Sequence, residues 1–219
     1  MKFKFLTATF ASLALACCSL ANAGLIIGAD SVTAPNSNGT ALAVNMINQN
    51  GLSQNYTSGV TDFDTFLSTA THNNSCGSNC WANVPSVTFP INLDFSLGGL
   101  FDLESIGIWN YNNTIGLNEF ELFAADNSSF LGATSLGIFN VGMESNFAAA
   151  SGQSFSFAST NASFIRMKLN SNYGSTSQVA IGEVVFEKAS STDIPEPSTL
   201  AIFALGLMGL VSRRFKKQS

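Results

Sequence analysis

Apolar and polar side chains alternate between residues 87 and 95, and this pattern constrains the fold more than any other part of the chain. The apolar positions are Val87, Phe89, Ile91, Leu93 and Phe95. In an extended segment they share one face, so the pattern predicts a strand that covers a core on one side. Pro90 cannot donate to a neighbouring strand, which indicates a sheet edge or an outward-facing amide there.

Further strands are predicted at short intervals, separated by turn-rich pieces. They cover residues 105–109, 118–124, 134–139, 154–158, 164–169 and 180–187. One short helix is predicted over 40–47, where Leu42 and Met46 are four residues apart. Short strands with polar loops and no sustained helical period predict an all-β protein, an antiparallel β-sandwich of the jelly-roll kind.

The N-terminal residues have the pattern of a secretory signal peptide. Lys2 and Lys4 precede an apolar stretch over 5–20, and Ala21-Asn22-Ala23 has the small residues of a cleavage site. We therefore expect signal peptidase to release a mature chain that begins at Gly24.

The C-terminal residues combine three features of different chemistry in a fixed order. Pro195-Glu196-Pro197 precedes an uncharged apolar run over 198–212, and Arg213 and Arg214 begin a basic end. As a helix, these 15 residues would rise about 22 Å, less than the bilayer core of about 30 Å. The basic end stays on the cytoplasmic side, so the preceding domain faces away from the cytoplasm. An ordinary tail-anchor helix is the alternative, although such an anchor is usually longer.

These residues, 194–219, resemble the PEP-CTERM sorting signal of Gram-negative bacteria, and we call them the sorting tail. In that family an exosortase, a membrane transpeptidase, processes the signal. The resemblance implies a precursor held in the inner membrane by a C-terminal hydrophobic helix, and then a cell-surface or secreted protein. The chain is therefore divided into a signal peptide (1–23), a β-sandwich domain (24–189), a linker with the Pro-Glu-Pro motif (190–197) and the hydrophobic segment with its basic end (198–219).

The predicted mature span is strongly acidic. Residues 24–194 contain thirteen Asp and Glu but only three basic residues, Arg166, Lys168 and Lys188, so the formal charge is −10. Nucleic acids and anionic membrane surfaces bind clustered Lys and Arg, so neither is expected as a partner. Neutral glycans remain possible partners.

Two cysteines, Cys76 and Cys80, remain after signal removal. An exported chain favours a disulfide that closes this small polar loop. A zinc site is disfavoured because His72 is the only histidine and zinc takes three or four protein ligands. Cys17 and Cys18 raise a lipoprotein as an alternative, although residues 15–18 fit its cleavage pattern poorly.

Several of the predicted strands resemble those of a discoidin or coagulation-factor-C-type domain. The similar segments are 103–110, 116–123, 164–169 and 181–186, mainly the Asn118-Glu119 turn and the closing strand with Glu183. The resemblance covers about residues 42–187 and implies a galactose-binding-like jelly roll. The chain departs from the family in a long polar loop over 71–83 and in lacking a long-range terminal disulfide, so lipid binding does not transfer.

Asp62 and Asp64 could supply carboxylate oxygens to calcium. The resemblance also implies a structural calcium in a loop near the start of the domain. A solvated turn is the alternative. Calcium is the one cofactor that the sequence suggests.

The motifs of most enzyme classes are absent from the sequence. It has no Gly-x-Ser-x-Gly elbow, no phosphate-binding loop with its lysine, and no His-Glu-x-x-His. His72 is the only candidate imidazole base, and a lone loop histidine is expected to be an inert surface residue. The sequence therefore predicts a protein that is not an enzyme, with a hydrolase as the weakest alternative.

Sugar binding needs aromatic platforms and a few orienting polar groups. The candidate platforms are Trp81, Trp109, Tyr111 and Tyr173, and Asn112 and Arg166 are the polar candidates. Trp109 ends an apolar strand and could equally belong to the core. Most of the 19 phenylalanines are expected in the core.

The sequence therefore predicts an exported matrix or surface protein that binds extracellular polysaccharide through its discoidin-like domain. The alternative is a structural or adhesive matrix protein without a specific glycan ligand.

Overall fold

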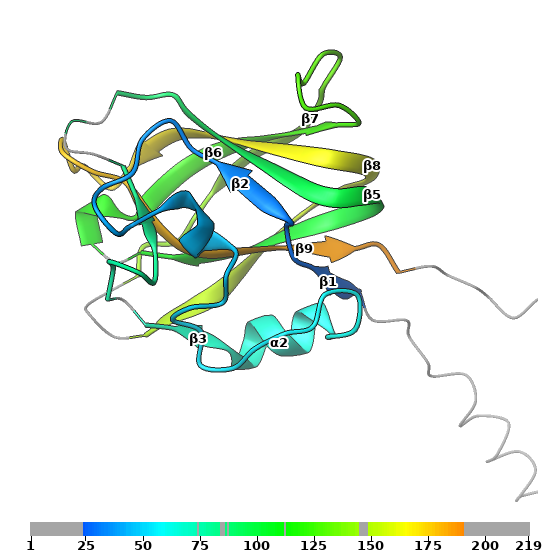
Figure 1. Ribbon diagram of the computed structural model, residues 1–219, viewed down its shortest axis with the longest axis horizontal. Helices are drawn as coiled ribbons and strands as arrows, with labels where there is room; N and C mark the ends of the chain where they lie inside the picture. The colour runs from blue at the N-terminus through cyan, green and yellow to red at the C-terminus, as the bar shows by residue number, and fades with distance from the viewer. Residues whose placement is uncertain are drawn as a thin grey trace, which may run out of the picture. The chain divides into compact units, whose positions relative to one another are not determined.

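The computed structural model describes residues 24–73, 75–83, 86, 88–111, 113–144 and 149–190 (Figure 1). The predicted signal peptide and residues 191–219, with Pro195, Glu196, Pro197, Arg213 and Arg214, lie outside the described residues. Within the described part, no helix is both long enough and apolar enough to span a bilayer.

Two long antiparallel strands, β5 (Ile91–Asn110) and β8 (Ala150–Asn172), organise the fold (Figure 1). Residues 91–96 of β5 pair with 164–169 of β8, and residues 101–109 pair with 152–162. The register shifts between Ser96 and Phe101, where Gly98 has a φ of +72° that favours glycine. Each long strand therefore contributes to both halves of the sheet.

The two halves of the sheet contain different additional strands. β2 (Ser31–Thr33) pairs with the start of β5, while β6 (Leu117–Ala125) pairs with the end of β8 and with β7 (Thr134–Asn140). β9 (Ala180–Lys188) pairs with the end of β5, with β1 (Leu25–Ile27) and with β4 (Trp81–Ala82). β3 (Thr71–His72) pairs with the start of β8.

The main core lies between these halves, as in a β-sandwich. Alternate residues of β5, including Leu93 and Phe95, are buried, and so are Ile165 of β8 and Phe186 of β9. The rings of Phe95 and Phe186 meet edge to face, with centroids 5.6 Å apart. The predicted all-β, antiparallel jelly-roll sandwich is confirmed.

Several predicted elements are confirmed, with different boundaries. The candidates at 118–124, 134–139 and 180–187 are β6, β7 and β9. The two candidates at 154–158 and 164–169 are parts of one strand, β8, and 105–109 belongs to β5. Pro90 immediately precedes β5, so the strand begins later than predicted. The helix predicted over 40–47 is a single 3₁₀ turn, η1 (Ala43–Met46); a second, η2 (Asn113–Ile115), precedes β6.

Helix α2 (Phe63–Thr69) was not predicted, and it covers the outer side of one half of the sheet (Figure 1). Asp62 caps it by accepting the Thr65 backbone N–H at 2.8 Å. Phe66 and Leu67 are buried, and the Phe66 and Trp109 rings meet edge to face at 5.8 Å. A helix of seven residues with a weak amphipathic pattern is too short to be predicted from sequence. Its formation therefore depends on tertiary packing.

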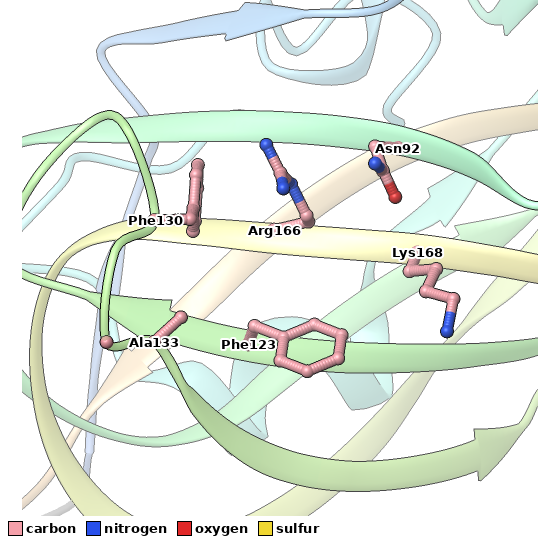
Figure 2. A pocket seen from close by; sticks show the side chains of 7 residues that line it. Asn92, Phe123, Phe130, Ala133, Arg166 and Lys168 are labelled. Carbon is pink, nitrogen blue, oxygen red and sulfur yellow. The ribbon is translucent and has the colours of Figure 1, made fainter.

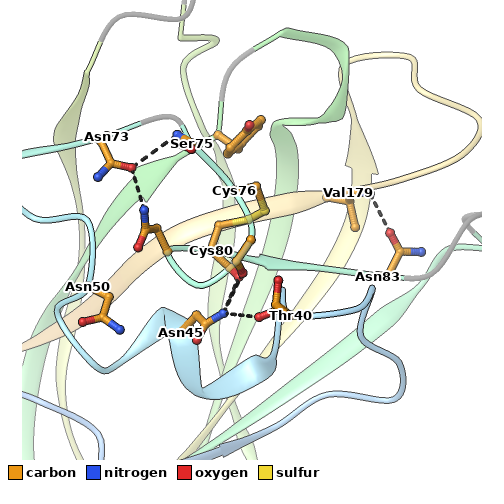
Figure 3. The surroundings of a disulfide bond; sticks show 12 residues. Thr40, Asn45, Asn50, Asn73, Ser75, Cys76, Cys80, Asn83 and Val179 are labelled. Atoms are coloured by element: carbon orange, nitrogen blue, oxygen red, sulfur yellow. Dashed lines mark hydrogen bonds between the residues drawn. A yellow bond between two sulfur atoms is a disulfide. The ribbon is translucent and has the colours of Figure 1, made fainter.

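The polar loop over 71–83 is held to the domain by side chains (Figure 3). The structure joins Cys76 and Cys80 by a disulfide. Asn45 of η1 is buried, and its Nδ2 donates to the backbone oxygens of Thr40, Gly77 and Cys80 at 2.9–3.0 Å. These bonds fix the loop to η1.

Candidate functional site

The outer face of the half-sheet formed by β5, β8 and β6 carries two rows of polar and aromatic side chains. In one row Asp94, Arg166 and Phe123 are register partners on neighbouring strands, and in the next row they are Asn92, Lys168 and Glu121. Because side chains alternate along a strand, the residues between them, such as Leu93 and Met167, point into the core.

Two ion pairs cross this face. Arg166 Nε and Nη2 donate to the two carboxylate oxygens of Asp94 at 2.7 and 2.8 Å, and Lys168 Nζ donates to Glu121 Oε2 at 3.0 Å. The hydrogen bonds that Arg166 donates to Asp94 raise the pKa of the guanidinium. These pairs hold the long cationic side chains in fixed positions, and they leave the rows without net charge.

The β6–β7 loop places Phe130 over this face. The side chain of Asn127 ties the loop together: its Nδ2 donates to Leu131 O at 3.1 Å and its Oδ1 accepts the Leu131 N–H at 3.2 Å. Phe130 has a φ of +56°, a left-handed conformation that is rare for a bulky residue. Its ring lies 4.2 Å from Arg166 Cζ and edge-on to Phe164.

Together these residues form a hollow of about 440 Å³, which we call the face pocket (Figure 2). Arg166 and Lys168 of β8, Asn92 of β5 and Phe123 of β6 line it from the strands, and the loop contributes Phe130, Gly132 and Ala133. Two of the three basic residues in the span 24–194 therefore lie in one hollow. Apolar ring faces beside a few oriented polar groups are typical of a small-ligand site.

Of the predicted sugar-binding residues, only Arg166 lines the face pocket. The prediction for Trp81 and Trp109 was wrong, because both side chains are 0% exposed. Trp81 Nε1 donates to Asn36 O at 2.9 Å and Trp109 Nε1 donates to Ala70 O at 3.0 Å, so each indole has an internal partner. Neither tryptophan can be a surface platform.

The remaining predicted residues lie elsewhere. Tyr111 is half-buried and packs against the small apolar cluster that contains Cys80. Tyr173 is half-buried and its hydroxyl donates to Val141 O. Asn112 lies outside the described residues. A role of these three residues in sugar binding stays a prediction.

His72 is buried, contrary to the prediction of a surface residue. Its Nε2 lies 3.1 Å from Asn50 O, and burial lowers the pKa of the imidazole. Nearby on β9, Glu183 is also fully buried and accepts the Gln49 backbone N–H at 3.2 and 3.3 Å. The imidazole is therefore almost completely enclosed.

No group of three or more His, Cys, Asp or Glu suited to a metal occurs among the residues that the structure describes. Asp62 Oδ1 caps α2, whereas its Oδ2 is buried and has no hydrogen-bond partner, which leaves one oxygen that suits a cation. The hydrogen bonds from Thr65 lower the pKa of Asp62. Calcium at Asp62 and Asp64 stays a prediction.

Sequence reasoning missed Phe130 and Phe123 because it assigned phenylalanines to the core. A signal for Phe130 was present, since it follows the turn Asp126-Asn127-Ser128 and an aromatic residue in a loop often has a binding role. Phe123 has no comparable signal, because its position in β6 does not tell whether the outer face is covered.

Comparisons with known proteins agree with this architecture. Residues 193–217 match the PEP-CTERM protein-sorting motif. No match was found among the curated proteins.

Solved structures that resemble the domain include carbohydrate-binding modules. The family 32 module of Clostridium perfringens NanJ, solved in complex with galactose, has a TM-score of 0.51 and 17% identity over 75% of this chain and 99% of that chain. A further module, CBM32-3 from a family 31 glycoside hydrolase of Clostridium perfringens, has a TM-score of 0.50 and 13% identity over 74% of this chain and 90% of its own.

Truncated AlyQ, which has CBM32 and alginate lyase domains, has a TM-score of 0.51 and 21% identity over 78% of this chain. This chain spans only 34% of the AlyQ chain. The protein thus carries a PEP-CTERM sorting motif, which indicates export as a membrane-anchored precursor, and its domain has the discoidin-like, galactose-binding-like fold of family 32 carbohydrate-binding modules.

Proposed function

We propose that this protein is a non-enzymatic, exported carbohydrate-binding protein whose face pocket holds a sugar of an extracellular polysaccharide. The observation that carries the proposal is Phe130, held at positive φ so that its ring forms a wall beside Arg166 and Phe123. Apolar ring faces suit the C–H faces of a sugar, and fixed donors and acceptors suit its hydroxyls. The fold shared with a module solved in complex with galactose supports it.

The charges of the face pocket and of the whole domain favour a neutral sugar as the ligand. Asp94 and Glu121 already balance the two cations of the pocket, and the span 24–194 carries a formal charge of −10. An acidic polysaccharide would therefore be repelled at long range and would have to displace a carboxylate. The hydroxyls of a neutral sugar can accept from Arg166 and Lys168 and donate to their carboxylate partners.

The processing partners follow from the two ends of the chain. Signal peptidase would remove residues 1–23, and an exosortase would act at the sorting tail, which matches the PEP-CTERM motif over 193–217. Until then the C-terminal segment tethers the protein to the inner membrane. The released domain works at the cell surface or in the extracellular matrix.

The test is binding of the processed protein to an array of neutral and acidic glycans. Neutral glycans are expected to bind, and Phe130→Ala is expected to lower affinity at least about tenfold, or about 1.4 kcal/mol. Leu131→Ala is the matched control, because Leu131 is in the same loop, 83% exposed, and does not line the pocket. Circular dichroism verifies that both variants fold. Binding to no glycan would contradict the proposal and favour a structural matrix protein.

A further inference from the structure

A second hollow of about 530 Å³ meets the face pocket at Asn92, and we call it the edge pocket. Its lining differs from that of the face pocket, because it combines amides and hydroxyls with apolar rings and contains no charged side chain. The residues that line the edge pocket are Pro35, Asn36, Asn83, Ser86, Thr88, Pro90, Ile91 and Asn92. Asn92 is exposed and lines both hollows.

The two pockets adjoin at Asn92 on β5. The face pocket extends over β6 and β8 to Asn92 on β5, and Pro35 and Asn36 of the edge pocket follow β2, which pairs with the opposite side of β5. From β6 to β2 there are three strand spacings, or about 14 Å. Each volume lies in the lower half of the range of about 300–1,000 Å³ for small-ligand pockets. The two adjoining hollows therefore have room for more than one sugar unit.

We propose that the face and edge pockets bind successive sugar units of one neutral polysaccharide chain, with Asn92 between them. This inference rests on the proposed function and names its ligand as a chain, not a single terminal sugar. The uncharged edge pocket adds hydroxyl partners without adding charge, in agreement with the balanced ion pairs of the face pocket. Filling both hollows adds contacts without a second loss of translational freedom.

The experiment measures the affinity of the processed protein for neutral gluco-, manno- and galacto-oligosaccharides of one to six units. Affinity is expected to rise at least tenfold with length and then to level off. Thr88→Tyr fills the edge pocket and should remove the gain from length, while the affinity for the shortest ligand that binds stays unchanged. Thr57→Tyr, at an exposed position outside both pockets, is the control.

The outcomes separate the two proposals. If affinity depends on Phe130 but is equal for oligosaccharides of all lengths, the proposal of chain binding is overturned, whereas the proposed sugar site in the face pocket is retained. Binding of none of the oligosaccharides overturns both.

Removal of the signal peptide would create a new N-terminus at Gly24. A Cβ added to Gly24 would lie 2.0 Å from Glu187 Oε1 and 2.6 Å from its Cδ, so the Gly24 backbone lies directly against this carboxylate. Both residues are buried. A larger residue at position 24 would require the Glu187 side chain to move.

Glu187 lies among other acids. Burial raises the pKa of Glu187, and the negative charges of Glu104, Asp64 and Asp62 raise it further, while a hydrogen bond from Ser105 opposes this. The ion pairs found among the described residues are Arg166–Asp94 and Lys168–Glu121, so no described cation pairs with Glu187. Carboxylates from β9, β5 and the start of α2 thus converge near Gly24.

We infer that signal peptide removal stabilises the domain by placing a positive charge against Glu187. Hydrolysis of the Ala23–Gly24 bond consumes one water. The new carboxylate leaves on the signal peptide, and the amide nitrogen of Gly24 becomes an α-ammonium. That ammonium supplies the cation that the acidic residues lack.

The experiment uses the processed protein, with its start at Gly24 verified by mass spectrometry. At near-neutral pH the α-amine, with an ordinary pKa of about 7.7–8.0, is acetylated before lysines, whose pKa is about 10.4. Acetylation is expected to lower Tm by about 3 °C. The pairing raises the pKa of the α-amine, so the difference in Tm shrinks as pH rises through that pKa.

In Glu187→Gln, acetylation should lower Tm by less than in the wild type, because the nearest carboxylate is gone, whereas in the control Glu144→Gln the full difference should persist. Equal Tm for free and acetylated protein overturns the inference, as does a mature chain that begins at another residue.

Discussion

At the residue scale, Glu183 is the most consequential buried group. It is 0% exposed, and burial raises the pKa of its carboxyl well above 4.5 despite hydrogen bonds from Gln49 and Tyr56. Above pH 4.5 the unfolded chain has released this proton while the folded protein keeps it, so stability falls as pH rises. Glu183→Gln removes this dependence. The stability of Glu183→Gln minus that of the wild type is expected to rise by up to about 1.4 kcal/mol per pH unit above pH 4.5.

Urea unfolding at several pH values measures this difference, and the contribution of His72 cancels because both proteins contain it. Glu144→Gln, a change at a partly exposed carboxyl, should leave the pH profile as in the wild type. A difference that does not vary with pH would show that Glu183 is ionised in the folded protein.

At the element scale, α2 can approach the sheet only because two strand residues lack side chains. A Cβ on Gly152 would lie 2.9 Å from Leu67 Cγ and 3.0 Å from the Leu67 backbone oxygen, and a Cβ on Gly107 would lie 2.7 Å from Leu67 Cδ1. Gly152→Ala should therefore push α2 outward and cost about 1–3 kcal/mol of unfolding free energy. Ser151→Ala, at the exposed neighbouring position, should cost less than about 0.5 kcal/mol. Equal urea midpoints for the two variants would refute this close packing.

At the scale of the whole molecule, the two ends are expected to be removed from the protein that reaches its destination. The Pro-Glu-Pro motif at 195–197 lies within the matched sorting motif and is expected to be the element that the exosortase recognises. Mass spectrometry of protein from the host's medium should find Gly24 at the start and no apolar run after Pro197. Glu196→Ala should leave membrane-bound protein that still contains Ser219, whereas Ser191→Ala, outside the motif, should be processed normally. Processed Glu196→Ala in the medium would exclude this motif as the recognition element.

Local patterns determined much of this protein, because they depend only on neighbours in the chain. Alternation around Leu93 and Phe95 requires a strand with one buried face, and the order of residue types at the C-terminus is enough to predict a sorting signal. The proximity of Cys76 and Cys80 similarly made their pairing predictable. These features follow from side-chain period, charge and chain geometry alone.

Only the tertiary structure decided which aromatic residues face solvent. Trp109 and Phe123 both lie in strands, but α2 packs against Trp109, whereas Phe123 lines the face pocket and is only partly buried. A period of two tells which residues share a face, yet it does not tell whether another element packs on that face. The site therefore depended on long-range packing, which brought Asp94, Arg166 and Phe130 together from three separate segments.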